Sequence, residues 1–365
     1  MKLNKRVLLM GLSLSVLSTM SFAEQASNAQ AVFNDAYQNY LNAIKTKENV
    51  QQAAEQAYTL GKTVYGENAD NTANLAINYA KSINRYGKQW IEKRFSLYQQ
   101  AYTILVNNHG KQSPVTIDAL VGMASFAPSA QKADYYLEQV IAIANTQNNP
   151  KFVADMKLEA ATILANKFSY EKYREAKNYL EEADEYYLAN LPKNSVEQIK
   201  ADFLMASFAE GRKRYDQAIE RLNRVVNVFD ESLSYDHNAE LTAHSRLISL
   251  YEKQGKSDEA TKHCIAIAKM VPWKESQEQT PLYRVNPKYP TNKARFRKDG
   301  KVVMEFEVDE SGFVKNPQVL SSEGGVAFEK SAVEALAQWR YAPKFEHGKA
   351  VAATSKVQLD FKVNR

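Results

Sequence analysis

Cysteine, glycine and proline are scarce in this 365-residue sequence, and each shortage limits the fold. Cys264 is the only cysteine, so no intrachain disulfide can form and the fold must be held by its hydrophobic core. Only 13 glycines and 10 prolines interrupt the backbone, whereas 21 tyrosines and 15 phenylalanines are available for burial. This balance favours helices, and an apolar content of 44% indicates a globular rather than a disordered protein.

The sequence also lacks the motifs of catalytic and metal sites. Gly-rich phosphate loops and nucleophile elbows are absent, and no pair of histidines has the spacing of a zinc-binding helix. We therefore expect no enzymatic activity, no catalytic residues, no metal site and no cofactor. No nucleic-acid-binding motif is present, so the excess of basic residues after residue 280 indicates acidic protein, wall or lipid partners before nucleic acid.

Residues 1–23 have the pattern of a secretory signal peptide. Lys2, Lys5 and Arg6 precede an apolar run, and Ser21-Phe22-Ala23 then places small residues at both ends of a cleavage site. The run is about 14 residues long, shorter than the roughly 20 that a membrane-spanning helix requires. The sequence therefore predicts a cleaved signal and export, with an uncleaved membrane anchor as the alternative. No later stretch is long and apolar enough to span a membrane.

A repeat of about 42 residues runs through residues 24–272. Four alanines in equivalent helical settings lie 43, 42 and 42 residues apart, and another step of 43 reaches Trp90 in a more divergent copy. A small residue lets two helices approach closely, and the residue four positions later falls on the same helix face. We call these positions the repeat seam. Its residues are Ala133, Ala176, Ala218 and Ala260, followed by Leu137, Leu180, Leu222 and Cys264.

Partner helices lie between these segments, because apolar residues recur there at spacings of three and four. Turns rich in Gly, Asn and Pro separate the resulting helix pairs. The last copy resembles a tetratricopeptide repeat at Leu247, Tyr251, Gly255, Ala260 and Pro272. The resemblance implies a right-handed superhelix with a concave face that binds proteins or peptides, and a period near 42 resembles the lengthened variant of that repeat.

The composition changes near residue 272, where four prolines gather before residue 291, and we assign residues 273–290 to a linker. Residues 302–308 then alternate apolar and polar as a half-buried strand does. A turn at residues 309–312 and a returning strand over residues 313–320 complete a hairpin, in which Gly312 tolerates a positive φ. Residues 327–341 have helical spacing, and residues 356–363 alternate again. The predicted order is strand, strand, helix, strand.

The motifs of this last region resemble the TonB C-terminal domain. The match begins near residue 281, and we place the domain itself at residues 291–365. The sequence departs from the family at residues 295–298. A basic run lies there, where the family often has a glycine shortly before the one matched by Gly300, so the local backbone is expected to differ. The matching motifs are Tyr289-Pro290, Gly300-Lys301-Val302, Phe306-Glu307-Val308-Asp309, Gly312, Ser321-Ser322, Phe328-Glu329 and Trp339-Arg340-Tyr341-Ala342-Pro343.

The resemblance implies that the domain recognises a short peptide on outer-membrane transporters, which adds to its sheet as an extra strand. Trp339, Tyr341, Phe306 and Phe328 fall on inward stripes and are expected in the core. The predicted partner-binding residues precede the hairpin or lie in the final strand. They are Asn286, Pro287, Lys288, Tyr289, Lys356, Gln358, Asp360 and Lys362.

The sequence therefore predicts an all-α tetratricopeptide-like superhelix followed by a small β-β-α-β domain of the TonB type. The implied function is a periplasmic protein-binding component of TonB-dependent outer-membrane transport. Its implied partners are a TonB-dependent receptor or another TonB-system protein, with inner-membrane motor proteins and a homodimer left open. TonB itself couples energy through a membrane helix and a Pro-rich spacer, which this sequence lacks, so a scaffold in cell-envelope assembly with a diverged TonB-like domain is the alternative.

Overall fold

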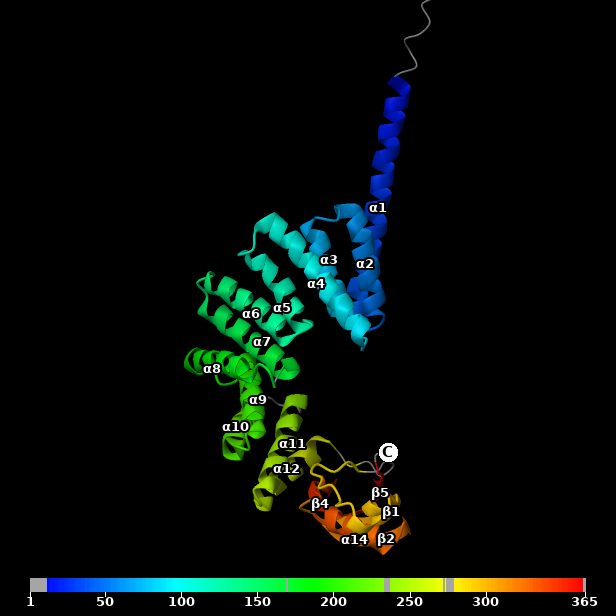
Figure 1. Cartoon of the computed structure of the whole chain (residues 1–365), viewed down its shortest axis with the longest axis vertical. Coiled ribbons are helices and arrows are strands. Elements are labelled where there is room, and N and C mark those ends of the chain that lie inside the picture. Colours follow the sequence, from blue (N-terminus) through cyan, green and yellow to red (C-terminus); the bar gives the residue numbers. More distant parts are fainter. Residues whose placement is uncertain (1–11, 169, 233–236, 272, 274–278, 364–365) are drawn as a thin grey trace, which may run out of the picture. The chain divides into compact units, whose positions relative to one another are not determined.

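The computed structural model describes residues 12–168, 170–232, 237–271, 273 and 279–363 (Figure 1). Residues 1–11 of the predicted signal and residues 272 and 274–278 around the predicted linker lie outside these ranges. The chain divides into two compact units, residues 1–186 and 187–365. Within the described ranges, no helix is both long enough and apolar enough to cross a membrane.

The described residues of the first unit form helices joined by turns, and the last of these helices, α8, continues into the second unit. Successive helices from α1 to α7 pack against one another, and a 3₁₀ turn, η1, precedes α5. The helices are α1 (Leu12–Thr46), α2 (Val50–Tyr65), α3 (Asp70–Ser82), α4 (Lys88–His109), η1 (Pro114–Thr116), α5 (Ile117–Ser125), α6 (Ala130–Asn145), α7 (Pro150–Phe168) and α8 (Tyr173–Asn190).

Aromatic side chains fill the core of the first four helices. Phe33, Tyr79 and Tyr98 are buried in one cluster with many alanines and leucines. Tyr98 stacks on Phe126 with ring centroids 6.0 Å apart, and Phe33 meets Tyr65 edge-on at 5.1 Å. Burial of such large side chains against small ones is the main stabilising contribution in a helical unit that has no disulfide.

The second unit begins with four more helices and continues into the C-terminal domain. Leu222, Val225 and Leu247 lie at the centre of the core of these helices and are fully buried. The Ser195 hydroxyl accepts a hydrogen bond from the Gln198 amide and so caps the first of them. These helices are α9 (Val196–Gly211), α10 (Tyr215–Ser232), α11 (Asn238–Lys253) and α12 (Ser257–Met270).

The repeat seam is buried throughout. All four alanines and all four residues that follow them by one helical turn have 0% exposure, in both units. The packing role predicted for these positions is therefore confirmed. Trp90, one step before them, is only half-buried, which agrees with its place in a divergent copy.

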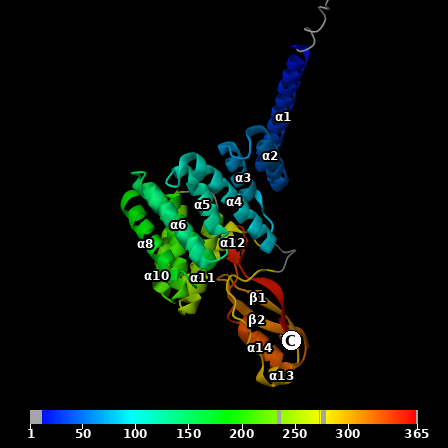
Figure 2. The same cartoon turned by 45° about the horizontal axis from the view of Figure 1, so that its top comes forward.

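The C-terminal domain is a three-stranded antiparallel sheet with the strand order β2-β1-β5, and α14 packs against β1 and β2 (Figure 2). A second, two-stranded sheet joins β3 and β4. The elements are α13 (Thr291–Arg295), β1 (Gly300–Val308), β2 (Val314–Glu323), α14 (Val326–Leu336), β3 (Lys344–Glu346), β4 (Lys349–Val351) and β5 (Ala353–Phe361).

The predicted inward stripes form the core of this domain. Trp339, Tyr341, Phe306 and Phe328 are each at most 2% exposed, as expected from the spacing. Gly312 has φ +83°, and a Cβ there would lie 2.2 Å from the carbonyl oxygen of Tyr341. The tight hairpin thus requires glycine for both its dihedral and its close contact.

The helix ends earlier than its apolar spacing predicts, at Leu336 rather than near residue 341. The backbone of the next residues bonds elsewhere, because the Arg340 amide donates to the Tyr283 carbonyl at 3.0 Å and the Tyr341 amide donates to the Gly312 carbonyl at 2.9 Å. Those long-range bonds replace the helical ones. The β3–β4 hairpin and α13 were not predicted, and the last strand ends at Phe361 rather than at residue 363.

Candidate functional site

Strand β5 lies at one edge of the three-stranded sheet. It pairs with β1 without a register shift, from Gly300 opposite Phe361 to Val308 opposite Ala353. No strand among the described residues pairs with its outer side. The N–H and C=O groups on that side are therefore available to another extended chain.

The side chains of β5 alternate between the core and the solvent. Val357, Leu359 and Phe361 are buried in the cluster that includes α14. Lys356, Gln358 and Asp360 are exposed on the opposite face, where the Lys356 ammonium lies 3.1 Å from the Glu305 carboxylate. The apolar row holds the strand in register, and the polar row flanks its open edge.

The opposite edge of the sheet, formed by β2, is a poorer template for pairing. Its register against β1 shifts twice, between Val303 and Met304 and between Glu305 and Glu307. Pro317 lies within the strand and has no N–H to donate, and Asn316 has φ +49°. Bulges and prolines of this kind protect an edge from strand addition. The regular edge is that of β5.

The segment before the sheet, residues 282–290, is bound along the domain by three side chains. Trp339 Nε1 donates to the Val285 carbonyl at 2.8 Å, the Ser331 hydroxyl donates to the Lys288 carbonyl, and the Tyr289 hydroxyl donates to the Lys298 carbonyl at 2.7 Å. Three side-chain hydrogen bonds therefore anchor the backbone of this segment to the domain.

The predicted binding residues of this segment differ in exposure. Asn286 and Lys288 have exposed side chains and Pro287 is half-buried. Tyr289 packs edge-on against Phe328 at 5.5 Å and against Phe361 at 5.9 Å between ring centroids. That contact brings the segment to the C-terminal end of β5. Lys362 follows the strand, and the next amide, of Val363, donates to the Asp299 carboxylate at 3.1 Å.

Comparison with known proteins identifies this region. Residues 285–363 match the family model described as Gram-negative bacterial TonB protein C-terminal. This region is similar to the TonB C-terminal domain, and we call it the TonB domain below. Protein TonB of Vibrio cholerae is 34% identical over 80 residues, which cover 22% of this chain and 33% of that protein. The matched segment thus spans a third of that relative's length.

Solved structures resemble each part of the chain. The solution structure of the Pseudomonas aeruginosa TonB C-terminal domain is 27% identical, with a TM-score of 0.22, and the match covers 25% of this chain and 92% of that one. A Podosopora anserina putative kinesin light chain with TPR-like repeats is 18% identical, with a TM-score of 0.44, over 54% of this chain and 92% of that one. The elements of the structure and the family match confirm the predicted fold class, helical repeats followed by a small TonB domain.

Arg340 connects the TonB domain to the last helix pair, and sequence reasoning missed this role. Its side chain is 1% exposed and forms an ion pair with Glu252 of α11. It donates to the Thr261 hydroxyl of α12 at 2.7 Å and to the Ser311 carbonyl of the β1–β2 turn at 2.8 Å. The guanidinium also lies 3.7 Å from the ring centroid of Phe313. The sequence did contain a sign of this role, because a charged residue stands between two predicted core residues, Trp339 and Tyr341.

Apolar contacts accompany this ion pair. Ile248 and Cys264 of the last helix pair pack against Tyr283 and Ala342 of the TonB region. Burial raises the pKa of the Cys264 thiol to about 12, so the thiol remains protonated and packs as a small apolar group. The β5 edge is therefore held in a defined position relative to α11 and α12.

Proposed function

We propose that the TonB domain binds an extended peptide of an envelope protein as a fourth strand on the outer edge of β5, while the helical repeats hold a second partner. The chain would then act as a non-catalytic, protein-binding component of TonB-dependent outer-membrane transport. The single observation that carries the proposal is the uninterrupted, unpaired β5 edge within a TonB domain. Periplasmic export by residues 1–23 belongs to the same proposal.

The chemistry of the edge suits a peptide partner. Backbone groups of an added strand would satisfy those of β5, and this supplies affinity without regard to sequence. The charges of Lys356 and Asp360, on either side of Gln358, alternate along the exposed face and would select among peptides. Asn286 and Lys288 lie exposed on the neighbouring segment and would contact the peptide where it leaves the strand.

Cysteine crosslinking tests the choice of edge. Gln358 of β5 and Ser321 of β2 both pair with Val303, so they occupy matched positions on opposite edges. Cys264 has 0% exposure and does not compete for a reagent. In full-length chains carrying Gln358→Cys or Ser321→Cys, we expect a cysteine-containing TonB-box peptide of a TonB-dependent receptor to form a disulfide with the first variant only.

Crosslinking at Ser321→Cys alone, or equally at both positions, would show that the peptide does not add to β5. A peptide with the same composition in scrambled order serves as the control for random collision. Deletion of residues 281–365 supplies the cellular readout, because the proposal requires loss of iron-complex or vitamin uptake.

The second candidate function is a repeat scaffold in cell-envelope assembly whose TonB domain has taken another ligand. The basic run of residues 295–298 favours it, since Phe296 is 68% exposed among cations. Normal uptake together with an envelope defect in the deletion strain would support this function instead. Both candidate functions are compatible with a signal that stays uncleaved and anchors the chain in the inner membrane. N-terminal sequencing of the isolated protein shows whether the signal has been cleaved.

A further inference from the structure

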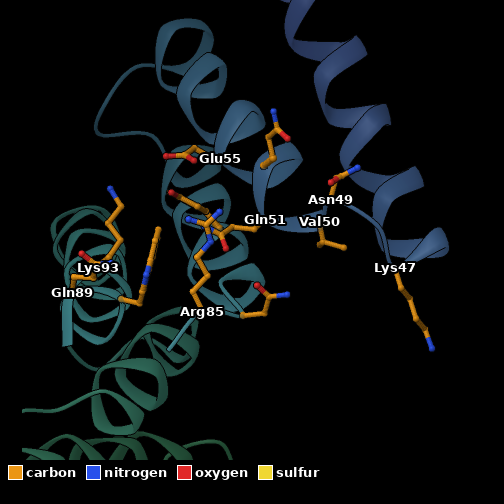
Figure 3. Close-up of a pocket in the computed structure, with 12 residues that line it drawn as sticks. Lys47, Asn49, Val50, Gln51, Glu55, Arg85, Gln89 and Lys93 are labelled. Atoms are coloured by element: carbon orange, nitrogen blue, oxygen red, sulfur yellow. The ribbon is translucent and has the colours of Figure 1, made fainter. Parts of the chain in front are cut away.

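A polar cavity of about 680 Å³ lies at the start of the helical array, within the first unit. It opens to solvent and is lined by the loop between α1 and α2, the first turns of α2, the end of α3 and the start of α4. Figure 3 shows Arg85 between Gln51 of α2 and Gln89 and Lys93 of α4, with Lys47 at the outer rim. The motifs that led to the TonB assignment do not involve this cavity.

The cavity carries a surplus of positive charge. Lys47, Arg85 and Lys93 line it, and among the described residues none of the three forms an ion pair. Glu55 is the one acid in the lining, so the lining carries two more positive charges than negative ones. Burial, with the nearby Glu55 carboxylate, raises the pKa of Tyr79, so the hydroxyl stays protonated and adds no negative charge to the cavity. The cations are left for an anionic ligand.

Both aromatic rings of the lining are already covered. The Arg85 guanidinium lies 4.8 Å from the ring centroid of Trp90, and the Lys93 ammonium lies 5.6 Å from that of Tyr79. Trp90 packs against the core of the unit, and Tyr79 is 2% exposed. A sugar that stacked on either ring would have to compete with the cation that already lies over it. This arrangement argues against an anionic glycan as the ligand.

The rest of the lining is rich in side-chain amides, from Asn49, Gln51, Gln52, Asn84 and Gln89. Each amide both donates and accepts hydrogen bonds. An extended peptide presents N–H and C=O groups in alternation, so its main chain matches such a lining on either side. Amides together with cations thus fit a peptide that carries carboxylates.

The loops around the cavity are held in place before any ligand arrives. The Arg94 guanidinium donates to the Ile83 carbonyl, which fixes the chain between α3 and α4. Lys47 and Asn49 adopt φ of +61° and +53°, a left-handed conformation that costs non-glycine residues free energy. A preformed site loses less entropy on binding than a flexible one.

We propose that this cavity binds an acidic, extended peptide segment of a partner protein, with its carboxylates at Arg85 and Lys93 and its main chain along the Asn and Gln side chains. The inference rests on the proposed partner-holding role of the repeats and names the chemistry of that partner. It concerns α1 to α4 alone, so it fails or holds independently of crosslinking at β5.

Fluorescence anisotropy with the full chain tests the proposal. The probe is a labelled peptide of about ten residues with alternating Glu and Gly, and the matched control peptide has Gln for Glu. We expect the Glu peptide to bind at least about tenfold more tightly, because charge-assisted hydrogen bonds exceed neutral ones. Arg85→Glu and Lys93→Glu should each weaken binding by about tenfold or more, and added salt should weaken it further.

Lys88→Glu is the control variant, because Lys88 lies on the same helix α4 with a side chain 90% exposed and outside the cavity lining. It should change affinity by less than about twofold. Equal binding of the two peptides, an equal effect of Lys88→Glu, or no binding would overturn the proposal. An oligogalacturonate of equal charge that competes more strongly than the Glu peptide would overturn it in favour of a glycan. Circular dichroism verifies that each variant keeps its helices.

Discussion

At the scale of single residues, the contact between His244 of α11 and His263 of α12 makes the last helix pair sensitive to acid. Their Nδ1 atoms lie 2.8 Å apart, so only one of these two nitrogen atoms can carry a proton at a time. The His263 ring stacks on Tyr251 at 5.6 Å, and the Glu240 carboxylate lies 4.0 Å from His244 Nε2. Burial, with the positive charges of His244 and Lys262, lowers the pKa of His263 to about 4.

The free energy of unfolding should therefore fall as the pH is lowered from 6.5 to 4. The unfolded chain takes up a proton on this histidine below its ordinary value of 6.5, whereas the folded chain does not until about 4. Stability is thus fully present above pH 6.5 and declines by at most about 3 kcal/mol over that window. Urea unfolding at a series of pH values measures it.

His263→Gln should flatten this pH dependence, and His347→Gln, on the exposed β3–β4 turn, should leave it unchanged. The comparison separates the histidine from the carboxylates, which also titrate in acid. An identical slope in the wild type and in His263→Gln would show that the contact does not govern the acid response.

At the scale of elements, the repeat seam depends on side-chain size as well as on apolar character. Ala176 of α8 is fully buried, whereas Ala189 of the same helix is exposed. Interiors are packed too closely to take three more carbon atoms without displacing a neighbour. The same helix therefore offers a tolerant position and an intolerant one for the same substitution.

Ala176→Leu should lower the free energy of unfolding by about 1–3 kcal/mol through overpacking. Ala189→Leu adds the same atoms at the surface and should stay within about 0.5 kcal/mol of the wild type. Chemical denaturation followed by circular dichroism provides both values. Equal losses in the two variants would mean that the small residue of the repeat is not a packing requirement.

At the scale of the whole molecule, Arg340 determines whether the TonB domain and the last helix pair unfold together. Glu252, its ion-pair partner, is only 11% exposed, and Arg340 Nε finds no hydrogen-bond partner among the described residues. The pair is therefore buried but not fully satisfied. Removal of one member leaves the other charge buried without its counter-ion.

Arg340→Met should destabilise the docked unit by about 3–5 kcal/mol and separate one thermal transition into two. Arg284→Met is the matched control, because the exposed Arg284 side chain lies over the Trp339 ring at 4.8 Å and forms no ion pair with the described residues of the repeats. The double variant Arg340→Met with Glu252→Leu should recover part of the loss, since no charge stays buried. Calorimetry measures the thermal transitions of all three variants. An unchanged transition in Arg340→Met would contradict the docking role.

Much of the architecture follows from local patterns in the sequence. The spacing of Ala133, Ala176, Ala218 and Ala260 marks helices that share one packing geometry, and the alternation along β1 and β5 marks half-buried strands. Such periods are visible in one sequence because they arise from helix and strand geometry within a few residues. The buried seam and the left-handed Gly312 were predicted from such local patterns, and the TonB domain from the resemblance of its motifs to that family.

Other features were decided by the tertiary structure alone. Arg340 forms its ion pair with Glu252, which lies 88 residues away in the sequence. The backbone hydrogen bonds that position Arg340 also end α14 at Leu336, although the apolar spacing continues beyond that residue. The contact of His244 with His263 and the cavity lined by Arg85 with residues of α2 and α4 likewise bring together residues that lie apart in the sequence. No local period encodes these contacts, because they depend on how whole elements pack. The sequence by itself determined most of the helices and strands and the faces that they bury, whereas packing determined the end of α14 and which polar groups meet.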